Sequence, residues 1–358
     1  MKKIIFYLPS LAPSGGIERI VSEIVNQLSS FYDITILVKD DGDSFYFIKD
    51  NVKIESIQNK LNLNMNSRIK RGVSTLNNIV SSVFKLRNYL KSREFDYIYI
   101  THPLAQLELL FASIPKNKII ISEHGASNNY NFTYKLIKKL TYKCCNSYCI
   151  PTTQDIEYYK AYNFPVVHTP HYKPKLDYSF SNLKNKVVLN IGRFTDDKKQ
   201  LTLLKIWSEV PGKYKHGWQL HIVGEGELAN DLSNFIANYN LQNEVKLLPP
   251  ISKVEKYYRD ASIFALTSRS EGFGMVLLEA IGFGLPLISF NCPSGPKDII
   301  NDRNGFLIPL DSEAEYKAKL IDLMNNEQLL ASLSNGAKLT AHNWSDYNIT
   351  TIWKNVFK

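Results

Sequence analysis

The sequence predicts an α/β protein with two parallel-sheet domains, and three observations support this. The chain has 358 residues, which exceeds what one hydrophobic core usually organises. Short runs rich in β-branched and aromatic residues alternate with helical patterns in both halves, as in doubly wound sheets. A composition of 44% hydrophobic and 22% charged residues is that of a globular protein.

In the first half, strands are expected at residues 3–8, 34–38, 52–57, 97–101, 119–122 and 149–152. Helices are expected between them at 16–28, 68–91, 104–113, 134–145 and 154–162. This alternation predicts a parallel sheet covered by helices on both faces. Ligands of such sheets bind at the carboxyl ends of the strands, so the loops that follow strands are the places to look for a site.

Residues 164–186 contain three prolines and no periodicity, which is typical of a linker, and His168 and His171 are assigned to this stretch. Six further strands are expected at 187–191, 220–223, 245–248, 263–266, 287–290 and 306–308, and three helical segments follow from Ser312 onward. The predicted domains are 1–168 and 187–340, joined by a linker at 169–186 and followed by a C-terminal helix at 341–358.

The second domain contains a glycine-rich stretch, residues 268–282, in which a strand leads through Gly272 and Gly274 into an apolar helix. Glycines let a ligand approach the backbone, and the N–H groups of Phe273, Gly274, Met275, Val276 and Leu277 at the helix start form an anion site.

Two carboxylates bracket that helix start. Glu271 precedes the helix and Glu279 lies inside it, so both can accept hydrogen bonds from hydroxyls that flank a bound phosphate. The alternative is a capped, solvated helix with Glu279 pointing outward.

Other strand ends carry further candidates. Gly15 and Gly16 open a helix after the first strand, but they do not form G-x-G-x-x-G and no acid ends the second strand, which disfavours a nicotinamide cofactor. His124 follows the strand at 119–122, where a histidine can donate to a ligand oxygen and respond to pH near neutrality. His102 has a similar position after the strand at 97–101.

Arg193 and Lys198 follow the strand at 187–191 and can reach one oxyanion as a guanidinium fork and a point charge. The alternative is a surface salt bridge of these cations with Asp196 or Asp197. The turn Gly224-Glu225-Gly226 is too short a match to indicate a dinucleotide site.

The net charge of +9 lies entirely in the first half, where residues 1–176 hold 23 Lys and Arg against 14 Asp and Glu; the remainder holds 20 of each. Residues 60–93 contain eight basic residues and no acid, and 134–143 repeat the pattern. Both segments are amphipathic, and the apolar stripe is interpreted mainly as a core face. The excess charge predicts an anionic partner such as a membrane surface. A nucleic acid is disfavoured because exposed aromatic residues do not interleave with the basic ones.

Several classes are excluded. Four cysteines without C-x2-C spacing argue against structural zinc and disulfides and fit a reducing cytoplasm. Asp41-Gly42-Asp43 has the composition of a turn, so no metal is predicted. Residues 1–8 are interpreted as a strand and not as a secretion signal, and no apolar run approaches the ~18 residues that span a bilayer.

Together, Gly15-Gly16 with Glu18, His124, Gly192-Arg193 with Lys198, and Glu271 with Glu279 resemble the motifs of retaining GT-B glycosyltransferases of family 4, the glycosyl transferases group 1, over nearly the whole chain. The resemblance implies two Rossmann-like domains that face each other across a cleft, with the C-terminal helix returning to the N-terminal domain. Residues 291–300 are similar to a motif of bacterial enzymes that build capsule and lipopolysaccharide, although Asn291 and Asp298 replace its usual acids.

The resemblance also implies a role for each residue. Arg193 and Lys198 would bind the donor diphosphate, with the N–H groups around Gly274, Met275 and Val276. Glu279 would hold the ribose and Glu271 the donor sugar, while Gly16 and His124 would act from the first domain. Residues 247–250, Leu-Leu-Pro-Pro, depart from the family pattern at the loop that usually touches the nucleobase.

The function expected from this resemblance is metal-independent, retaining transfer of a hexose or N-acetylhexosamine from a nucleotide sugar, expected to be a UDP-sugar, to a polyprenyl-diphosphate-linked glycan. No cofactor is expected. The enzyme would be cytoplasmic and peripheral on the inner face of the plasma membrane. The alternative is a non-catalytic carbohydrate- or lipid-binding partner with the same fold.

Overall fold

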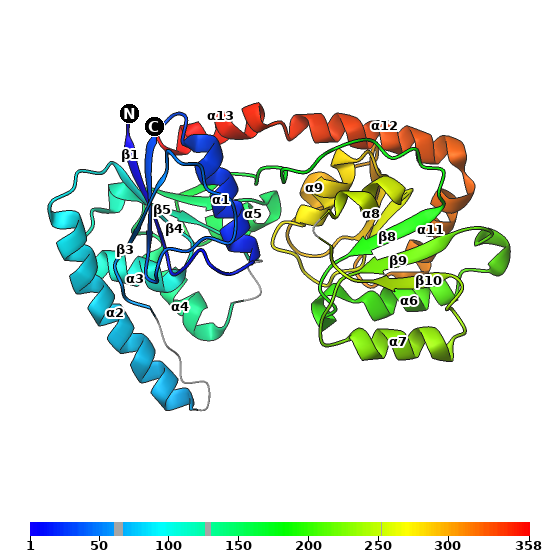
Figure 1. Ribbon diagram of the computed structural model, residues 1–358, viewed down its shortest axis with the longest axis horizontal. Coiled ribbons are helices and arrows are strands. Elements are labelled where there is room, and N and C mark those ends of the chain that lie inside the picture. The colour runs from blue at the N-terminus through cyan, green and yellow to red at the C-terminus, as the bar shows by residue number, and fades with distance from the viewer. Residues whose placement is uncertain (61–66, 126–129, 252) are drawn as a thin grey trace. The chain divides into compact units, whose positions relative to one another are not determined.

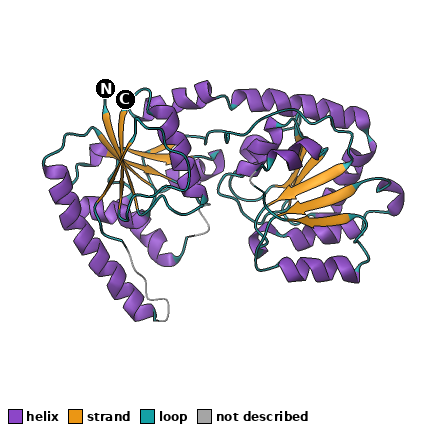
Figure 2. Ribbon diagram, in the orientation of Figure 1, coloured by secondary structure: helices purple, strands orange, loops and turns teal. Residues whose placement is uncertain are grey.

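The computed structural model describes residues 1–60, 67–125, 130–251 and 253–358. The chain forms two compact units: unit 1 comprises Met1–Tyr172 and Asp346–Lys358, and unit 2 comprises Lys173–Ser345. Each unit contains one parallel sheet with helices packed on its faces, as Figures 1 and 2 show. The α/β prediction is therefore confirmed for both halves.

The sheet of unit 1 has seven strands in the order β3-β2-β1-β4-β5-β6-β7. The strands are β1 (Lys3–Leu8), β2 (Asp33–Val38), β3 (Lys53–Ser56), β4 (Tyr97–Ile100), β5 (Ile119–Ser122), β6 (Ser147–Ile150) and β7 (Val166–His168). The chain reverses its direction of travel across the sheet between β1 and β4. At such a switch point the loops after the two strands diverge and leave a crevice for a ligand.

In the described part of unit 1, the helices around this sheet are α1 (Gly16–Leu28), α2 (Arg68–Lys91), α3 (Pro103–Phe111), α4 (Phe132–Thr141), α5 (Thr153–Lys160) and α13 (Asp346–Val356). A short 3-10 helix spans Lys116–Lys118. One core contains buried side chains of α2, α3 and α5. Helices α1 and α13 contact each other. The fully buried Trp353 of α13 donates its indole N–H to the carbonyl of Pro170 at 3.3 Å, so the C-terminal helix belongs to the first domain.

Most boundaries in unit 1 agree with the prediction to within one or two residues, and three elements show larger or instructive differences. Helix α4 begins at Phe132 because the side chain of Asn131 caps it by accepting the N–H of Tyr134 at 2.9 Å. Strand β6 ends at Ile150, since Pro151 follows and cannot donate to the ladder. Residues 166–168, placed in the proline-rich linker stretch, pair with β6 as the edge strand β7.

The sheet of unit 2 has six strands in the order β10-β9-β8-β11-β12-β13, with its switch point between β8 and β11. The strands are β8 (Val187–Ile191), β9 (Gln219–Val223), β10 (Val245–Leu248), β11 (Ile263–Leu266), β12 (Leu287–Phe290) and β13 (Gly305–Ile308). The helices are α6 (Gln200–Ser208), α7 (Ala229–Asn238), α8 (Glu255–Asp260), α9 (Met275–Gly282), α10 (Pro296–Ile299), α11 (Glu313–Asn325) and α12 (Glu327–Asn343), with 3-10 turns at Asp196–Lys198 and Gly212–Tyr214.

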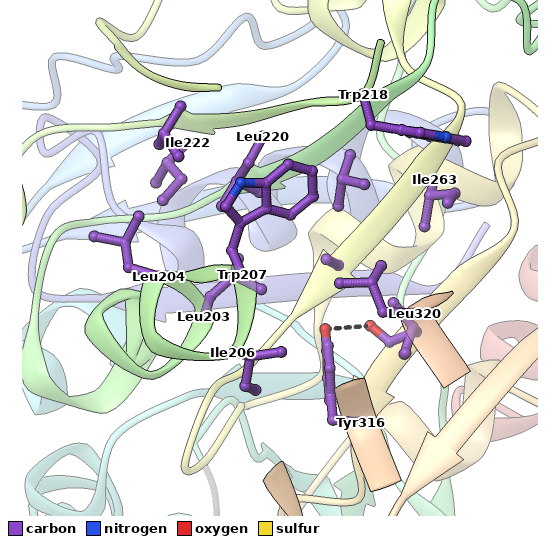
Figure 3. Close-up of a cluster of buried hydrophobic side chains, with 14 of the residues drawn as sticks. Leu203, Leu204, Ile206, Trp207, Trp218, Leu220, Ile222, Ile263, Tyr316 and Leu320 are labelled. Carbon is purple, nitrogen blue, oxygen red and sulfur yellow. Dashed lines mark hydrogen bonds between the residues drawn. The ribbon is translucent and has the colours of Figure 1, made fainter. Parts of the chain in front are cut away.

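One of the hydrophobic cores of unit 2 is built around tryptophan (Figure 3). Trp207 of α6 is fully buried, and Trp218 satisfies its buried N–H by donating to the carbonyl of Met324 at 3.0 Å. Tyr316 of α11 donates its hydroxyl to the carbonyl of Ile288 at 3.2 Å. The polar atoms of Trp218 and Tyr316 are thus paired inside the core, and the Tyr316 bond fixes α11 against β12.

Candidate active site

The switch point of unit 2 brings two polar loops together. Strands β8 and β11 are paired neighbours, and the loop after β8 carries Arg193 and Lys198 while the loop after β11 runs from Thr267 to Gly274. Parallel strands end at the same edge of a sheet, so the two loops extend from that edge side by side. The sequence predicted both loops as parts of a site, and the structure shows how they contact each other.

A charge pair joins the loops. The ammonium of Lys198 lies 2.6 Å from Oε1 of Glu271, and the Ser268 hydroxyl donates to the same oxygen at 2.6 Å. Glu271 is only 8% exposed, and its backbone N–H donates to the carbonyl of Pro293 at 3.1 Å. Two side chains therefore hold one oxygen of the carboxylate, and a backbone hydrogen bond fixes the residue that carries it.

The backbones of the two loops are also fastened together. The hydroxyl of Thr267 donates to the carbonyls of Lys198 and Lys199 at 3.2 and 3.0 Å. Arg269 donates its N–H to the carbonyl of Asp197 at 2.7 Å, and its guanidinium lies 2.7 Å from the Asp196 carboxylate.

The proposed alternative, a surface salt bridge of the predicted cations with Asp196 or Asp197, is therefore wrong for Lys198. This lysine pairs with Glu271, and Arg269 takes Asp196. The sequence could not show this exchange of partners, because Glu271 is more than 70 residues away from Lys198 along the chain.

Arg193 lies on the same loop as Lys198, and its backbone is fixed by hydrogen bonds. The side chain of Gln200 donates to the Arg193 carbonyl at 2.9 Å, and the N–H of Gly192 donates to the carbonyl of Val223 at 3.0 Å. The Arg193 side chain is exposed, and within the described ranges no hydrogen bond or ion pair engages its guanidinium. A guanidinium that is exposed and not engaged by other side chains can bind a phosphate through its planar fork of N–H donors.

Two glycines after β9 support the Arg193 loop. A Cβ on Gly224 would collide with the carbonyl of Gly192, and one on Gly226 would collide with the backbone of Phe194. The N–H of Phe194 in turn donates to the carbonyl of Glu225 at 2.8 Å. The Gly224-Glu225-Gly226 turn thus needs glycines because it packs closely against the loop after β8. No dinucleotide site is required to account for them.

Helix α9 begins as predicted, directly after Gly274, whose φ of +83° lies in the left-handed region that favours glycine. The predicted set of N–H donors needs one correction: Leu277 donates to the carbonyl of Gly274 at 2.8 Å and is not available to a ligand. The N–H groups of Met275 and Val276 precede this first bond and belong to the helix start, where donors have no intrahelical acceptor.

The loop after β12 packs against the turn that precedes α9. Gly295 has a φ of +108°, and a Cβ there would collide with the carbonyl of Phe273. The carbonyl of Pro293 already accepts the N–H of Glu271. The motif at residues 291–300 therefore has a structural role, because it fixes the backbone that carries Glu271 and the start of α9.

Glu279 points inward. It is 4% exposed, and the hydroxyl of Tyr258, a fully buried residue of α8, donates to its Oε2 at 2.6 Å. The alternative of an outward, solvated Glu279 is wrong. A buried carboxylate with a fixed hydroxyl partner is oriented in advance for a further hydrogen bond.

In unit 1, the loop after β1 ends at Gly15, which caps α1, and Gly16 is the first helical residue. A Cβ at Gly16 would meet no heavy atom within 4 Å. The fold itself therefore does not require glycine at position 16, and its small size leaves room beside the helix start.

His124 lies after β5, as predicted, with its ring stacked on His171 at 5.4 Å between centroids. Its Nε2 is 3.3 Å from the hydroxyl of Tyr99. Burial lowers the pKa of His124 to about 4, outweighing the opposing effect of Glu123. The expectation that His124 responds to pH near neutrality is therefore wrong, and its imidazole is neutral at pH 7.

A buried ion pair holds the backbone of the His124 loop. One carboxylate oxygen of Glu123 accepts the N–H groups of His124 and Gly125 at 3.0 and 3.2 Å, and the other is bound by the ammonium of Lys138. Three tyrosine hydroxyls complete the shell around this carboxylate, from Tyr130, Tyr148 and Tyr159. Burial alone would raise the pKa of the Glu123 carboxyl group. Lys138 and the hydrogen bonds lower this pKa by more than burial raises it, so the carboxylate stays ionised.

Other histidines have structural positions. His102 caps α3 by accepting the N–H of Leu104 at 3.2 Å, and burial lowers its pKa to about 4. His168 lies in β7 near the carbonyl of Pro151 at 3.2 Å, and His171 is buried against His124. The assignment of His168 and His171 to a linker was wrong, because both belong to the packed part of unit 1.

Sequence reasoning missed four residues that shape these loops. Ser268 and Thr267 follow a strand and could have been included on that ground. Tyr258 and Glu123 gave no local signal, since their function depends on partners that fold next to them. Among the described residues, no three His, Cys, Asp or Glu side chains are grouped as a metal site.

Comparison with known proteins connects this geometry to a family. Residues 175–340 match the family model Glycosyl transferases group 1. The amylovoran biosynthesis glycosyltransferase AmsD of Erwinia amylovora is 28% identical over 369 residues, covering 99% of this chain and 98% of the relative. A GalNAc-α-(1→4)-GalNAc-α-(1→3)-diNAcBac-PP-undecaprenol α-1,4-N-acetyl-D-galactosaminyltransferase of Campylobacter jejuni is 27% identical, covering 99% and 97%.

The crystal structure of Staphylococcus aureus TarM in complex with fondaparinux, α-GlcNAc-glycerol and UDP superposes with a TM-score of 0.75 at 15% identity and covers all of both chains. Such a likeness establishes the fold. The chain is thus a glycosyltransferase with the GT-B fold, and residues 175–340, which include all strands of its second domain, match the glycosyl transferases group 1 model.

Proposed function

We propose that this enzyme transfers a hexose or N-acetylhexosamine from a UDP-sugar to a polyprenyl-diphosphate-linked glycan, with retention of anomeric configuration and without a metal ion. The observation that carries the proposal is the cluster at the end of β8 and β11. There Arg193 and Lys198 lie on one loop, and Glu271 and the start of α9 follow the other.

This cluster suits a nucleotide diphosphate as a leaving group. Glycosyl transfer passes through an oxocarbenium-like state, and negative charge builds on the departing diphosphate. The exposed guanidinium of Arg193, the ammonium of Lys198 and the N–H groups of Met275 and Val276 would stabilise that charge. Because the loops are fastened by internal hydrogen bonds, these donors need little reorganisation during the reaction.

The carboxylates would recognise hydroxyl groups. Glu279, oriented by Tyr258, would accept hydrogen bonds from the ribose, and Glu271 would accept them from the donor sugar. Glu271 would also hold Lys198 at the position where the diphosphate leaves. In unit 1, the open space at Gly16 would admit the phosphates, and the neutral His124 would contact the sugar by hydrogen bonding without adding charge.

The proposed acceptor follows from the relatives. The Campylobacter enzyme is named for a substrate linked to PP-undecaprenol, and AmsD is named for amylovoran biosynthesis. A lipid-linked acceptor requires the enzyme to work at a membrane surface. No helix in the described ranges is both long and apolar enough to cross a bilayer.

Helix α2 offers such a surface contact because it has two apolar faces. Its core face carries buried side chains, Ile79, Val83, Leu86 and Leu90. A second row is exposed at roughly helical spacing, Val73, Leu76, Val80 and Phe84. The sequence predicts mainly a core face for this apolar stripe, and that prediction is wrong for the second row.

Helix α4 adds a similar row of exposed side chains, Phe132, Leu136 and Leu140, and Phe111 is exposed at the end of α3. Helix α3 contacts both α2 and α4, so these rows lie on neighbouring helices. Exposed lysines flank the α4 row, although Lys138 is an exception to the predicted basic face because it is buried against Glu123. We propose that these rows rest on an anionic membrane at the inner face of the plasma membrane, where each Lys or Arg adds about 1 kcal/mol.

The catalytic proposal is tested by incubating the full chain with labelled nucleotide sugars and a lipid-linked oligosaccharide in the presence of EDTA. The expected result is transfer from a UDP-sugar, with an NMR coupling constant in the product that shows the anomeric configuration of the donor. Transfer that stops on chelation and returns with Mg²⁺ would contradict metal independence, and an inverted product would contradict retention.

The membrane proposal is tested by flotation with phosphatidylglycerol vesicles. Changing both Leu76 and Phe84 to Ser is expected to reduce the bound fraction at least about tenfold, because two apolar side chains no longer enter the interface. Phe47→Ser is the control, since Phe47 is exposed outside α2, α3 and α4. Equal losses in both proteins, or unchanged binding in the double variant, would contradict the assignment.

A further inference from the structure

A pocket of about 300 Å³ lies between α4 and α5 in unit 1. Six aromatic side chains, three lysines and one leucine line it. Phe132, Lys135, Leu136 and Lys139 come from α4, and Tyr158 and Tyr162 come from α5 and the turn after it. Ligand sites are commonly concave, mostly apolar and provided with a few fixed polar groups, and this pocket meets that description.

The aromatic wall is held in place by its own contacts. Tyr158 and Tyr162 approach with their hydroxyl oxygens 3.5 Å apart, and Tyr162 stacks on Phe164 with 5.7 Å between ring centroids. Tyr159 also stacks on Phe164, with 6.0 Å between ring centroids. The rings therefore do not need to be ordered by a ligand, which reduces the entropic cost of binding.

The charges of the pocket favour an anion. Lys138, which also lines it, is already paired with Glu123. Lys135 and Lys139 are exposed, and in the described part of the chain neither ammonium has an acidic partner. They lie one helical turn apart, about 6 Å along the axis, which matches two neighbouring phosphates. Residues 131–143 contain no Asp or Glu.

These features describe a site for an apolar chain that ends in a diphosphate. The pocket is also connected to the loop of His124. Three lining residues, Lys138, Tyr130 and Tyr159, bind the Glu123 carboxylate. The same carboxylate accepts the backbone N–H groups of His124 and Gly125. A ligand in the pocket would thus lie one layer of side chains from that loop. This connection favours a substrate over a bulk membrane lipid.

We propose that the α4–α5 pocket binds the isoprenyl diphosphate end of the acceptor lipid, with the first isoprene units against the tyrosine rings and the diphosphate between Lys135 and Lys139. This inference rests on the proposed function, since it assigns the acceptor of that reaction to a place in the first domain. The pocket shares no residue with the loops proposed to bind the nucleotide.

Farnesyl diphosphate, titrated into the full chain by calorimetry, tests the site. Leu136→Trp places a large ring in the pocket without changing charge, and affinity is expected to fall at least about tenfold because the chain loses its space. Leu140→Trp is the matched control: Leu140 lies on the same exposed row of α4, 68% exposed, but does not line the pocket. The pair Lys135→Ala and Lys139→Ala is expected to weaken binding by a similar factor, and Lys143→Ala is not.

Three results of the binding experiments would overturn the inference. The first is that the wild type does not bind farnesyl diphosphate. The second is that Leu136→Trp and Leu140→Trp lose the same affinity for farnesyl diphosphate. The third is that the wild type binds dihexanoyl phosphatidylglycerol with equal affinity, which would make the pocket a phospholipid site. Binding of UDP by each variant is measured in parallel. If the Leu136→Trp variant still transfers sugar to a lipid-linked acceptor, the pocket is not the acceptor site, and the proposed function stands. If the wild type binds farnesyl diphosphate in the pocket but transfers no sugar, the proposed function alone is rejected.

Discussion

Nζ of Lys198 lies 2.6 Å from Oε1 of Glu271, so the cation proposed to bind the donor diphosphate is paired with the carboxylate proposed to bind the donor sugar. A phosphate that enters must compete with Glu271 for this ammonium. We predict that Glu271→Gln binds UDP about fivefold more tightly, because the substitution frees Lys198 and removes a negative charge that repels phosphate. Calorimetric titration of UDP measures this effect.

The matched control is Ser268→Ala, which removes the second hydrogen bond to Oε1 of Glu271 and keeps the charge pair. Its UDP affinity is expected to stay within about twofold of the wild type, since a neutral hydrogen bond contributes less than a charge. Weaker UDP binding by Glu271→Gln would show that the carboxylate orders the site more than it competes for Lys198.

Gly295→Ala is predicted to destabilise unit 2 by about 1 to 3 kcal/mol, because alanine must adopt a φ of +108° and its Cβ meets the carbonyl of Phe273. The displaced Phe273-Gly274 turn should also lower the UDP affinity. Urea denaturation followed by tryptophan fluorescence measures the stability. Gly212→Ala is the control, since a Cβ there meets no atom within 4 Å and its stability should change by less than about 0.5 kcal/mol. Equal effects of both substitutions would contradict the role given to residues 291–300.

Glu123→Gln is predicted to destabilise unit 1 by about 3 to 5 kcal/mol, because it leaves the buried ammonium of Lys138 without its partner charge. Adding Lys138→Met should recover much of that loss, since no uncompensated charge remains. Denaturation of the two single variants and the double variant gives the coupling energy. Glu157→Gln, in the exposed pair with Lys160, should change stability by less than about 0.5 kcal/mol. Additive effects of the two buried substitutions would show that the ion pair does not hold the structure.

The stability of unit 1 is predicted to fall on acidification. Burial lowers the pKa of His124 and of His102 to about 4, and it lowers that of His171 well below its usual value. In the unfolded chain these groups take up protons near pH 6.5. Between about pH 6.5 and 4 the unfolded state therefore binds more protons than the folded state, so stability is full above pH 6.5 and decreases below it.

Thermal unfolding at pH 7.5 and pH 5 tests this sign. The wild type should unfold at a lower temperature at pH 5, and His171→Phe, which keeps a ring against His124 and removes one titrating group, should show a smaller difference. A transition temperature that is equal at both pH values would contradict the assignment of neutral, buried histidines.

The alternation of strands and helices was predictable because each element has its own local pattern of side chains, and the start of α9 followed from Gly272 and Gly274. The limits appear where a residue depends on a distant partner. The pairing of Lys198 with Glu271 and of Tyr258 with Glu279 arises only after the strands are ordered in the sheet. The burial of Lys138 could not be predicted for the same reason, because its charge and spacing are those of an exposed lysine.

Short edge strands and the buried faces of helices were also difficult to predict from the sequence. Strand β7 is three residues long and follows a proline, so its sequence is indistinguishable from a loop until β6 provides a partner. Helix α2 has apolar residues on two faces, and only the packed structure shows that Val83 and Leu86 enter the core while Val80 and Phe84 stay outside.

The Lys198–Glu271 pair is proposed to lie at the centre of a sugar-transfer site, and initial transfer rates from a UDP-sugar to a lipid-linked acceptor measure whether this claim holds. The rates of the wild type, Glu271→Gln and Glu315→Gln are compared at saturating donor; Glu315 is an exposed acid of α11 in the same unit. We predict that Glu271→Gln loses at least about a hundredfold in kcat, because a group acting in the transition state has been removed, while Glu315→Gln keeps the wild-type rate. A Glu271→Gln enzyme that transfers sugar as fast as the wild type would contradict the claim.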